Sequence, residues 1–211
     1  MGITTKKPPM KETVGAQYIC FVTQTEDGDW QNKFDANVEK TEVVKKIKVS
    51  ENMSSEVAYA SGVVYDSDST SGNTMIEVEV IAFPADTLAK MRGEKVDVGG
   101  LILSGAGGSR PYFAYGKVVK LKRGKIRMEW YPKCKLTENS DEASTKTEKF
   151  AEQTDTVKIS AYPFDAEGNI KAYVDSSVTG FPEGLTEEKF FAKPILTVED
   201  LKTAAGVALK A

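Results

Sequence analysis

The chain has 211 residues, of which 40% are hydrophobic and 28% charged, and its formal net charge is −3. This composition is typical of a protein that folds around a core, and the acidic balance disfavours a surface that grips nucleic acid. The sequence contains no histidine, which excludes Ser-His and Cys-His catalysis and removes the commonest metal ligand. We therefore expect no enzyme activity, no cofactor and no metal, and no stretch is apolar enough to span a membrane.

The N-terminal part is predicted to begin with a flexible arm over residues 1–14, because its lysines and prolines offer little to bury. A strand is expected over 17–25, where apolar and aromatic residues are dense. Cys20 and Cys134 stand far apart in the sequence and match no metal-ligand spacing. They are expected to be buried, reduced thiols of a protein made in a cytoplasm.

Two long strands are predicted over 41–49 and 57–65, joined by the polar link 50–56 and followed by a polar loop over 66–73. Adjacent valines in both strands place apolar side chains on both faces, a pattern that invites edge-to-edge pairing. The strands could form a central hairpin buried on both faces, or an edge that a neighbouring subunit completes. The candidate interface residues are Val43, Val44, Ile47, Val49, Val57, Tyr59, Val63 and Tyr65.

Residues 74–83 alternate between apolar and acidic side chains, which predicts a half-exposed antiparallel strand. Pro84 should then begin a short helix that ends before Gly93. The glycine-rich segment 99–108 lacks the Lys-Ser/Thr pair and the following helix of a phosphate-binding loop. We therefore predict that it is a flexible loop.

A hairpin is predicted over 117–130, with Arg123-Gly124 as a two-residue turn. In this register Lys122 faces Lys125 and Leu121 faces Ile126, so the apolar residues share one face, except Val118. The other face is cationic, and it could be a solvated surface, a contact with an acidic patch of another copy, or a phosphate site. Its basic residues are Lys120, Lys122, Lys125 and Arg127, and acidic candidates to meet them are Asp66, Asp68, Glu138, Asp141 and Glu142.

A second hairpin is expected from residues 156–162 and 170–174, followed by an irregular stretch over 175–196. Thr197 can cap a C-terminal helical segment over 197–211. Together these elements predict a mainly β fold, a β-sandwich or barrel-like structure with one short flanking helix and long loops. A single β domain is expected over 15–196, between the arm and the C-terminal segment.

Three stretches resemble the major tail proteins of siphophages, chiefly those of Gram-positive hosts. They are IEVEVIAFPADTLAKMRG (76–93), RPYFAYGKVVKLKRGKIRMEWYPKCKL (110–136) and TKTEKFAEQTDTVKISAYPFDAEGNIKAYVD (145–175). Their order and spacing match those of the family, and together they span most of residues 40–195. The ordered set, rather than any single motif, makes the resemblance.

The resemblance implies a structural protein of the virion tail, made in the host bacterial cytoplasm. Six copies would form a ring and contribute strands to an inner β-barrel, for which 41–49 and 57–65 are the candidates. Rings would stack around a tape-measure protein, meet the tail terminator and distal tail proteins, and pass DNA through the lumen during ejection without specific binding. The family has no catalytic residues, and the ring-stacking candidates are Asp66, Asp68, Lys120, Lys122, Lys125 and Arg127.

Other functions remain open. A tube protein of a tail-like bacteriocin or of a secretion apparatus would have the same sequence features. A monomeric β-sandwich that binds carbohydrate or peptide would expose clustered aromatic residues on one face. Trp130, Tyr112 and Phe113 instead lie in core-like runs.

Overall fold

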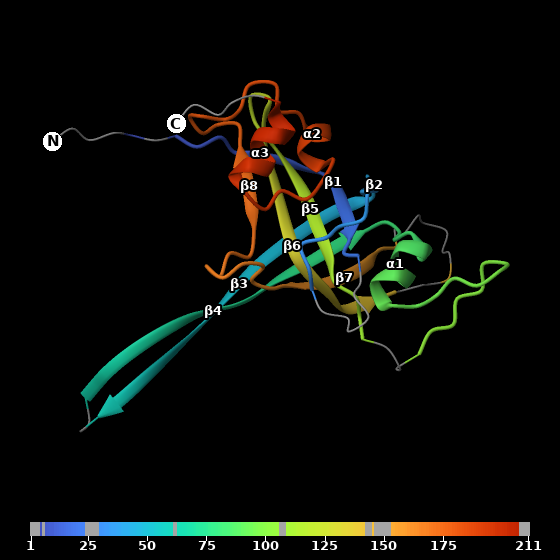
Figure 1. Ribbon diagram of the computed structural model, residues 1–211, viewed down its shortest axis with the longest axis horizontal. Coiled ribbons are helices and arrows are strands. Elements are labelled where there is room, and N and C mark those ends of the chain that lie inside the picture. The colour runs from blue at the N-terminus through green and yellow to red at the C-terminus, as the bar shows by residue number, and fades with distance from the viewer. Residues whose placement is uncertain are drawn as a thin grey trace. The chain divides into compact units, whose positions relative to one another are not determined.

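Figure 1 shows the computed structural model of the chain. The structure describes residues 5, 7–23, 30–60, 63–105, 109–141, 145 and 153–206, with the backbone alone over 52–60 and 63–71. The described fold is mainly β, as predicted, and its paired strands are antiparallel. The elements are β1 (Lys11–Phe21), β2 (Glu39–Thr41), β3 (Val44–Ala60), β4 (Val63–Val80), α1 (Ala85–Arg92), β5 (Phe113–Leu121), β6 (Lys125–Ser140), β7 (Asp155–Ala161), β8 (Ala172–Asp175), α2 (Glu187–Phe191) and α3 (Val198–Ala205).

The chain divides into two compact units. The first unit contains the chain up to Val44, Phe113–Pro132 and the chain from Lys171 onward; the second contains Lys45–Tyr112 and Lys133–Ile170. Strand β6 runs through both, so its first part belongs to one unit and its last part to the other. Each unit is therefore built from segments that are distant in the sequence.

In the first unit the strand order is β2-β1-β5-β6, and β8 adds to the first part of β6. β1 begins at Lys11, inside the segment that was expected to be an arm, because its N-terminal part pairs with the end of β5. One face of these strands packs on α2 and α3. The buried residues of this core are Ala16, Tyr18, Cys20, Ala114, Val118, Met128, Trp130, Leu185, Phe190, Phe191, Ile195 and Ala205.

Aromatic packing fixes α2 on this sheet. The Phe191 ring stacks on Tyr18 with centroids 3.9 Å apart and an interplanar angle of 1°. The Trp130 indole N–H donates to the carbonyl oxygen of Phe190 at 3.1 Å. No helix was predicted here, because α2 is a short element that packing of Phe190 and Phe191 stabilises, rather than one that helix propensity alone would form.

The β5–β6 hairpin has a register one residue away from the prediction. Val118 packs in the same core as Met128 and Trp130, and Lys117 pairs with Glu129 on the opposite face. Side chains that share a face in the structure were predicted on opposite faces. A shift of one residue has this effect because successive side chains of a strand point to opposite sides.

The physical cause lies in the connection between the strands. β5 ends at Leu121 and β6 begins at Lys125, so three residues rather than two form the turn. Arg123 and Gly124 both have φ of 67°, a left-handed conformation that glycine adopts at no steric cost. The three-residue loop thus places Lys117, rather than Val118, beside Glu129.

The second unit has the strand order β6-β7-β4-β3 together with α1. The alternation predicted over 74–83 is observed as far as Val80, where β4 ends, since Ile76, Val78 and Val80 are fully buried and Glu77 and Glu79 are half-buried. Helix α1 begins after Pro84 and ends at Gly93 in a left-handed conformation, also as predicted. This unit therefore keeps the amphipathic pattern that its sequence shows.

Strands β3 and β4 are much longer than the strands predicted for this region. The prediction of one strand over 57–65 is wrong, because β3 ends at Ala60 and β4 begins at Val63. The expected link 50–56 lies within β3 and the expected loop 66–73 lies within β4. Both predictions are wrong, because they took polar residues as evidence against a strand. Backbone hydrogen bonds between β3 and β4 join the two strands, and this pairing is compatible with polar side chains.

The predicted hairpin of 156–162 with 170–174 is also wrong. β7 pairs with β4 and with the last part of β6, whereas β8 pairs with Arg127–Trp130 of β6. The turn between them is as expected, since the Asp165 carboxylate accepts the backbone N–H of Glu167 and of Asn169. A turn signal indicates where the chain reverses, but not which strands it pairs.

Candidate assembly surface

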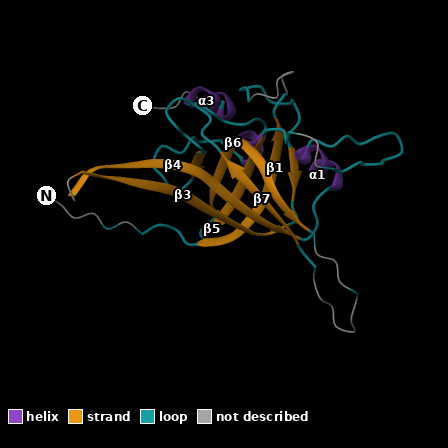
Figure 2. Cartoon of the chain, turned by 90° about the horizontal axis from the view of Figure 1, so that it is seen from below, coloured by secondary structure: helices purple, strands orange, loops and turns teal. Residues whose placement is uncertain are grey.

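The edge of the second unit is formed by β3, whose neighbour in the sheet is β4. β4 pairs with β7 over Thr74–Val80. Figures 1 and 2 show β3 and β4 continuing together beyond this stretch as a two-stranded ribbon. A long edge strand presents backbone N–H and C=O groups that can pair with another chain.

The base of the ribbon combines charged and apolar side chains. Ile47 and Val49 are half-buried on β3, whereas Lys46 and Lys48 are exposed. Lys45 Nζ lies 3.9 Å from a carboxylate oxygen of Glu79 on β4. Exposed lysines on an edge strand discourage unselective pairing, so this edge favours a partner that can accommodate positive charge.

Most of the predicted interface residues lie on these two strands. Val44, Ile47, Val49, Val57 and Tyr59 are on β3, and Val63 and Tyr65 are on β4. Val43 directly precedes β3 and is half-buried. Asp66 and Asp68 lie on the ribbon portion of β4 instead of in a loop. The structure describes only the backbone at Val57, Tyr59, Val63, Tyr65, Asp66 and Asp68. The role of the whole set stays a prediction.

The basic residues of the β5–β6 hairpin do not form one cationic face. Lys120 has the parity of Val118, which packs in the core with Met128, whereas Arg127 has the parity of Glu129. Arg127 Nε donates to Asp175 Oδ2 at 2.9 Å, so its charge is matched within the unit. Lys120, Lys122 and Lys125 are exposed around the turn, and their ring-stacking role stays a prediction.

A second exposed feature is the segment 94–104, whose second half belongs to the flexible loop predicted over 99–108. Val96 and Ile102 form an antiparallel bridge, and Asp97 N–H donates to the carbonyl oxygen of Leu101 at 2.8 Å. Gly99 and Gly100 form the tip with φ of 88° and 80°. These glycines allow a tight left-handed reversal, so this part of the loop is an ordered miniature hairpin.

The base of this miniature hairpin is also held. The Arg110 guanidinium Nη1 donates to the carbonyl oxygens of Leu136 and Thr137 at 2.8 and 2.7 Å. Gly93 lies so close to Ser109 that a Cβ at this position would come within 3.2 Å of the Ser109 carbonyl oxygen. The residues that flank the miniature hairpin, Gly93 on one side and Arg110 on the other, are thus both held by contacts within the second unit.

The miniature hairpin exposes apolar side chains to solvent. Val98 is 103% exposed and Leu103 is 68% exposed, and Val96 and Leu101 are also well exposed. An ordered cluster of exposed apolar residues is typical of a surface that contacts another molecule. The sequence contained a signal for it, because VDVGGLIL places a Gly-Gly turn between two apolar runs.

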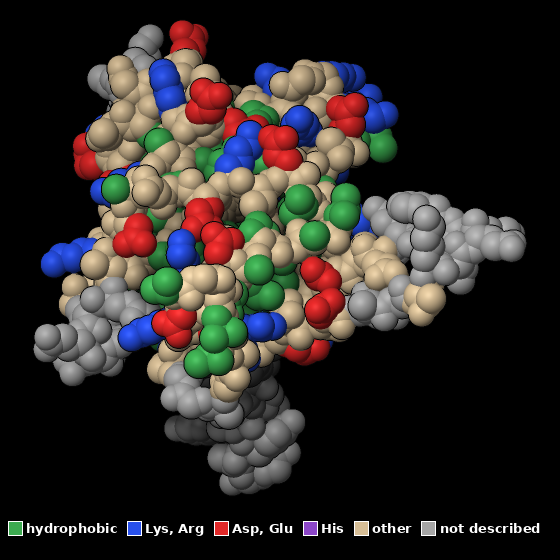
Figure 3. Space-filling view, turned by 90° about the vertical axis from the view of Figure 1, so that its right-hand side faces the viewer, with side chains coloured by type: hydrophobic (Ala, Val, Ile, Leu, Met, Phe, Trp, Pro, Cys, Tyr) green, Lys and Arg blue, Asp and Glu red, His purple; other side chains and the backbone are tan. Residues whose placement is uncertain are grey.

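Figure 3 shows one face of the molecule on which acidic and basic side chains are interspersed and hydrophobic side chains reach the surface between them. No large field of one sign covers this face within the described residues. Association through such a surface depends on local contacts rather than on long-range attraction.

Metal and membrane sites are not found in the described part of the chain. Among those residues no group of His, Cys, Asp and Glu is arranged to hold a metal ion, and no helix there is long and apolar enough to span a bilayer. Both cysteines are buried as reduced thiols. Burial raises the pKa of Cys20 to about 12, which keeps this thiol protonated and unreactive at neutral pH.

Comparisons with known proteins do not assign the chain to a family. No protein-family model matches it, and no curated protein matches its sequence. A solved structure with some similarity is a chain in the cryo-EM structure of the anti-feeding prophage baseplate, 6-fold symmetrised. The two are 7% identical, with a TM-score of 0.37, over 82% of this chain and 97% of that chain. This TM-score is too low to assign a shared fold or function.

Proposed function

We propose that this chain is a self-assembling structural subunit of a bacteriophage tail tube. In this proposal β3 of one copy pairs with a strand of a neighbouring copy, and six copies close a ring around a central channel. The rings stack around a tape-measure protein, and the channel conducts DNA during ejection. No residue has a catalytic role.

The observation that carries the proposal is the length of the β3–β4 ribbon. β3 spans Val44–Ala60 and is the last strand in the strand order. On its other side, β4 pairs with β7 over the stretch Thr74–Val80. A ribbon of this length would expose far more unpaired edge than a monomer usually tolerates. Closing the edge between copies into a barrel removes that liability, because a closed sheet has no edges.

Two further features support the proposal. The stretches 76–93, 110–136 and 145–175 resemble the siphophage major tail proteins in order and spacing. The net charge of −3 also suits a channel wall along which DNA slides, because an acidic surface does not retain phosphates.

Electron microscopy of the protein, concentrated or co-expressed with its tape-measure protein, tests the proposal. We expect rings or tubes with a central channel. A protein that sediments as a monomer under both conditions would overturn it.

A pair of proline variants tests the role of β3 directly. Adjacent residues of an antiparallel strand direct their N–H groups to opposite edges, so Lys45→Pro and Lys46→Pro remove donors from opposite sides of β3. One variant should lose thermal stability because it breaks the β3–β4 ladder. The other should remain as stable as the wild type but fail to assemble. Lys45→Thr and Lys46→Thr control for the lost charge, and a stable proline variant that assembles normally would exclude pairing through this edge.

A further inference from the structure

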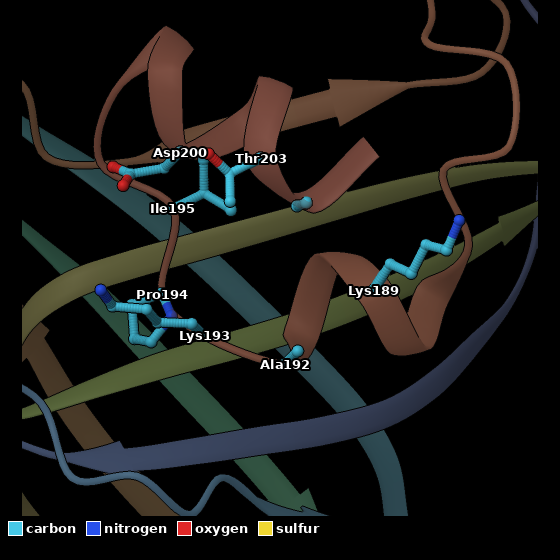
Figure 4. Close-up of a pocket in the computed structure, with 8 residues that line it drawn as sticks. Lys189, Ala192, Lys193, Pro194, Ile195, Asp200 and Thr203 are labelled. Atoms are coloured by element: carbon cyan, nitrogen blue, oxygen red, sulfur yellow. The ribbon is translucent and has the colours of Figure 1, made fainter. Parts of the chain in front are cut away.

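A groove lies between α2 and α3 in the first unit (Figure 4), with a volume of about 330 Å³. Figure 4 shows the α2 end of the groove at Lys189 and Ala192, the α3 end at Asp200 and Thr203, and the connecting segment between them. A dry cavity of roughly 150 Å³ is enough to hold benzene, so this groove can take more than one aliphatic side chain. Its lining residues are Lys189, Ala192, Lys193, Pro194, Ile195, Asp200, Thr203 and Ala204.

The groove has an apolar floor and a basic rim. Its one acidic lining residue, Asp200, is occupied by the capping box of α3, where it accepts the Thr197 N–H at 2.9 Å and the Thr197 hydroxyl at 2.8 Å. Lys189 Nζ donates to the Gly184 carbonyl oxygen at 3.0 Å, whereas Lys193 is exposed beside the groove. An apolar ligand that brings a carboxylate would therefore match this groove.

The miniature hairpin at 96–103 has the complementary chemistry. Its side chains are aliphatic apart from the glycines and Asp97, which is its single charge. Val98 and Leu101 are exposed on either side of the Gly99-Gly100 tip. The Asp97 N–H donates to Leu101 and the Gly100 N–H donates to Asp97, and these backbone hydrogen bonds restrict the hairpin, so little conformational entropy is lost when it binds.

We propose that the tip of the 96–103 hairpin of one copy docks in the α2–α3 groove of a second copy. Val98 and Leu101 enter between the helices, and the Asp97 carboxylate meets the Lys193 ammonium at the rim. The inference rests on the proposed function, because it names one of the contacts by which the subunits assemble. Since the two surfaces differ, the contact is head-to-tail, and such contacts propagate into rings or filaments.

Cysteine cross-linking between two variants tests this contact. Val98→Cys protein is mixed with Ala192→Cys protein and treated with a short bis-maleimide, and the covalent dimer is quantified by gel. The native thiols add little background because both are buried. Glu183→Cys, at another exposed position of the first unit, replaces Ala192→Cys in the matched control. We expect several-fold more dimer from the 98–192 pair than from the control, and equal yields would overturn the proposal.

A charge swap provides an independent measurement. Lys193→Glu on the Ala192→Cys copy should reduce cross-linking several-fold, and Asp97→Lys on the Val98→Cys copy should restore it. Restoration supports the Asp97–Lys193 pair, because a variant that simply distorts the groove would not be rescued from the other copy. Persistent loss in the double exchange would count against the proposal.

The outcomes also separate this contact from the proposed function. If the wild type forms rings or tubes but the 98–192 yield equals the control, the docking contact is wrong while the tail-tube proposal stands. If the 98–192 pair cross-links but no rings or tubes form, the copies associate through this contact without building a tube.

Discussion

The two hairpins β5–β6 and β3–β4 have similar backbone pairing but differ in how their side chains and edges are covered. β5–β6 is buried on both faces, with Trp130 and Met128 on one side and Tyr115 and Tyr131 on the other. The β3–β4 hairpin extends beyond the stretch Thr74–Val80 in which β4 pairs with β7, and β3 is the edge strand of the sheet. The first hairpin therefore derives its stability from side-chain packing, whereas the second has an edge that a partner can satisfy.

This difference predicts how the two hairpins respond to substitution. Changes in the centre of β5–β6 should lower the free energy of unfolding, since each buried side chain there contacts other core residues. Changes on the edge of β3 should alter assembly more than stability. The following variants test the comparison on the β5–β6 side, from the largest expected effect to the smallest.

Lys117→Met should have the largest effect. Lys117 Nζ lies 3.1 Å from Glu129 Oε2, and both side chains are almost fully buried. Burial lowers the pKa of Lys117, and the neighbouring Glu129 partly offsets this effect. Removing the lysine leaves the Glu129 carboxylate buried without its counter-ion, which should cost about 3–5 kcal/mol by urea denaturation.

The double variant Lys117→Met/Glu129→Leu is the control for this experiment. Replacing both charges with apolar residues of similar size should bring the unfolding free energy back close to that of the wild type. If the single and double variants were equally destabilised, packing rather than the unpaired charge would explain the loss.

Gly116→Ala should have the next largest effect. An added Cβ would lie 2.7 Å from Phe191 Cε1 and 3.1 Å from Trp130 Cε3, so the aromatic core has to shift. Overpacking of this kind should cost about 1–3 kcal/mol, measured by thermal or chemical unfolding. Gly105→Ala is the matched control, because a Cβ there meets nothing within 4 Å, and its stability should stay within about 0.5 kcal/mol of the wild type.

Asp175 should give a smaller, pH-dependent effect. Burial alone would raise the pKa of Asp175, but hydrogen bonds from Ser177 and pairing with Arg127 outweigh it and hold the pKa below its ordinary value of 3.8. The folded state therefore gains stability from this carboxylate above about pH 3.8 and loses it as the pH falls through the lower folded-state pKa.

Asp175→Asn measures this contribution. The variant should lose about 1 kcal/mol at neutral pH and show a shallower decline of stability between pH 5 and pH 2 than the wild type. Parallel denaturation curves at each pH give the comparison. Identical slopes for the two proteins would show that other carboxylates cause the acid sensitivity.

Sequence patterns located most elements but not their partners. The alternation at 74–80 and the caps of α1 are local features, and both were predicted correctly. For the C-terminal segment, Thr197 was correctly identified as the cap, and α3 ends at Gly206 in a left-handed conformation. The prediction that β7 and β8 pair with each other was wrong, because each of them pairs with β6. Such pairing depends on long-range contacts, which no local pattern encodes.

The candidate surfaces also combine local features that the sequence predicts with long-range contacts that it does not. The sequence by itself determined that the chain is mainly β and that it contains no histidine. It predicted strands in the 41–65 region but not where one strand ends and the next begins, since the predicted strand 57–65 is divided between β3 and β4. Tertiary structure alone decided the β5–β6 register, because a three-residue turn and a buried Lys117–Glu129 pair select it over an alternative that differs by one residue. It also decided that residues 96–103 present an ordered apolar tip, since the Asp97–Leu101 hydrogen bond and the Arg110 anchor hold this hairpin. Local sequence fixes what a segment can form, whereas register and exposure depend on which distant residues it meets.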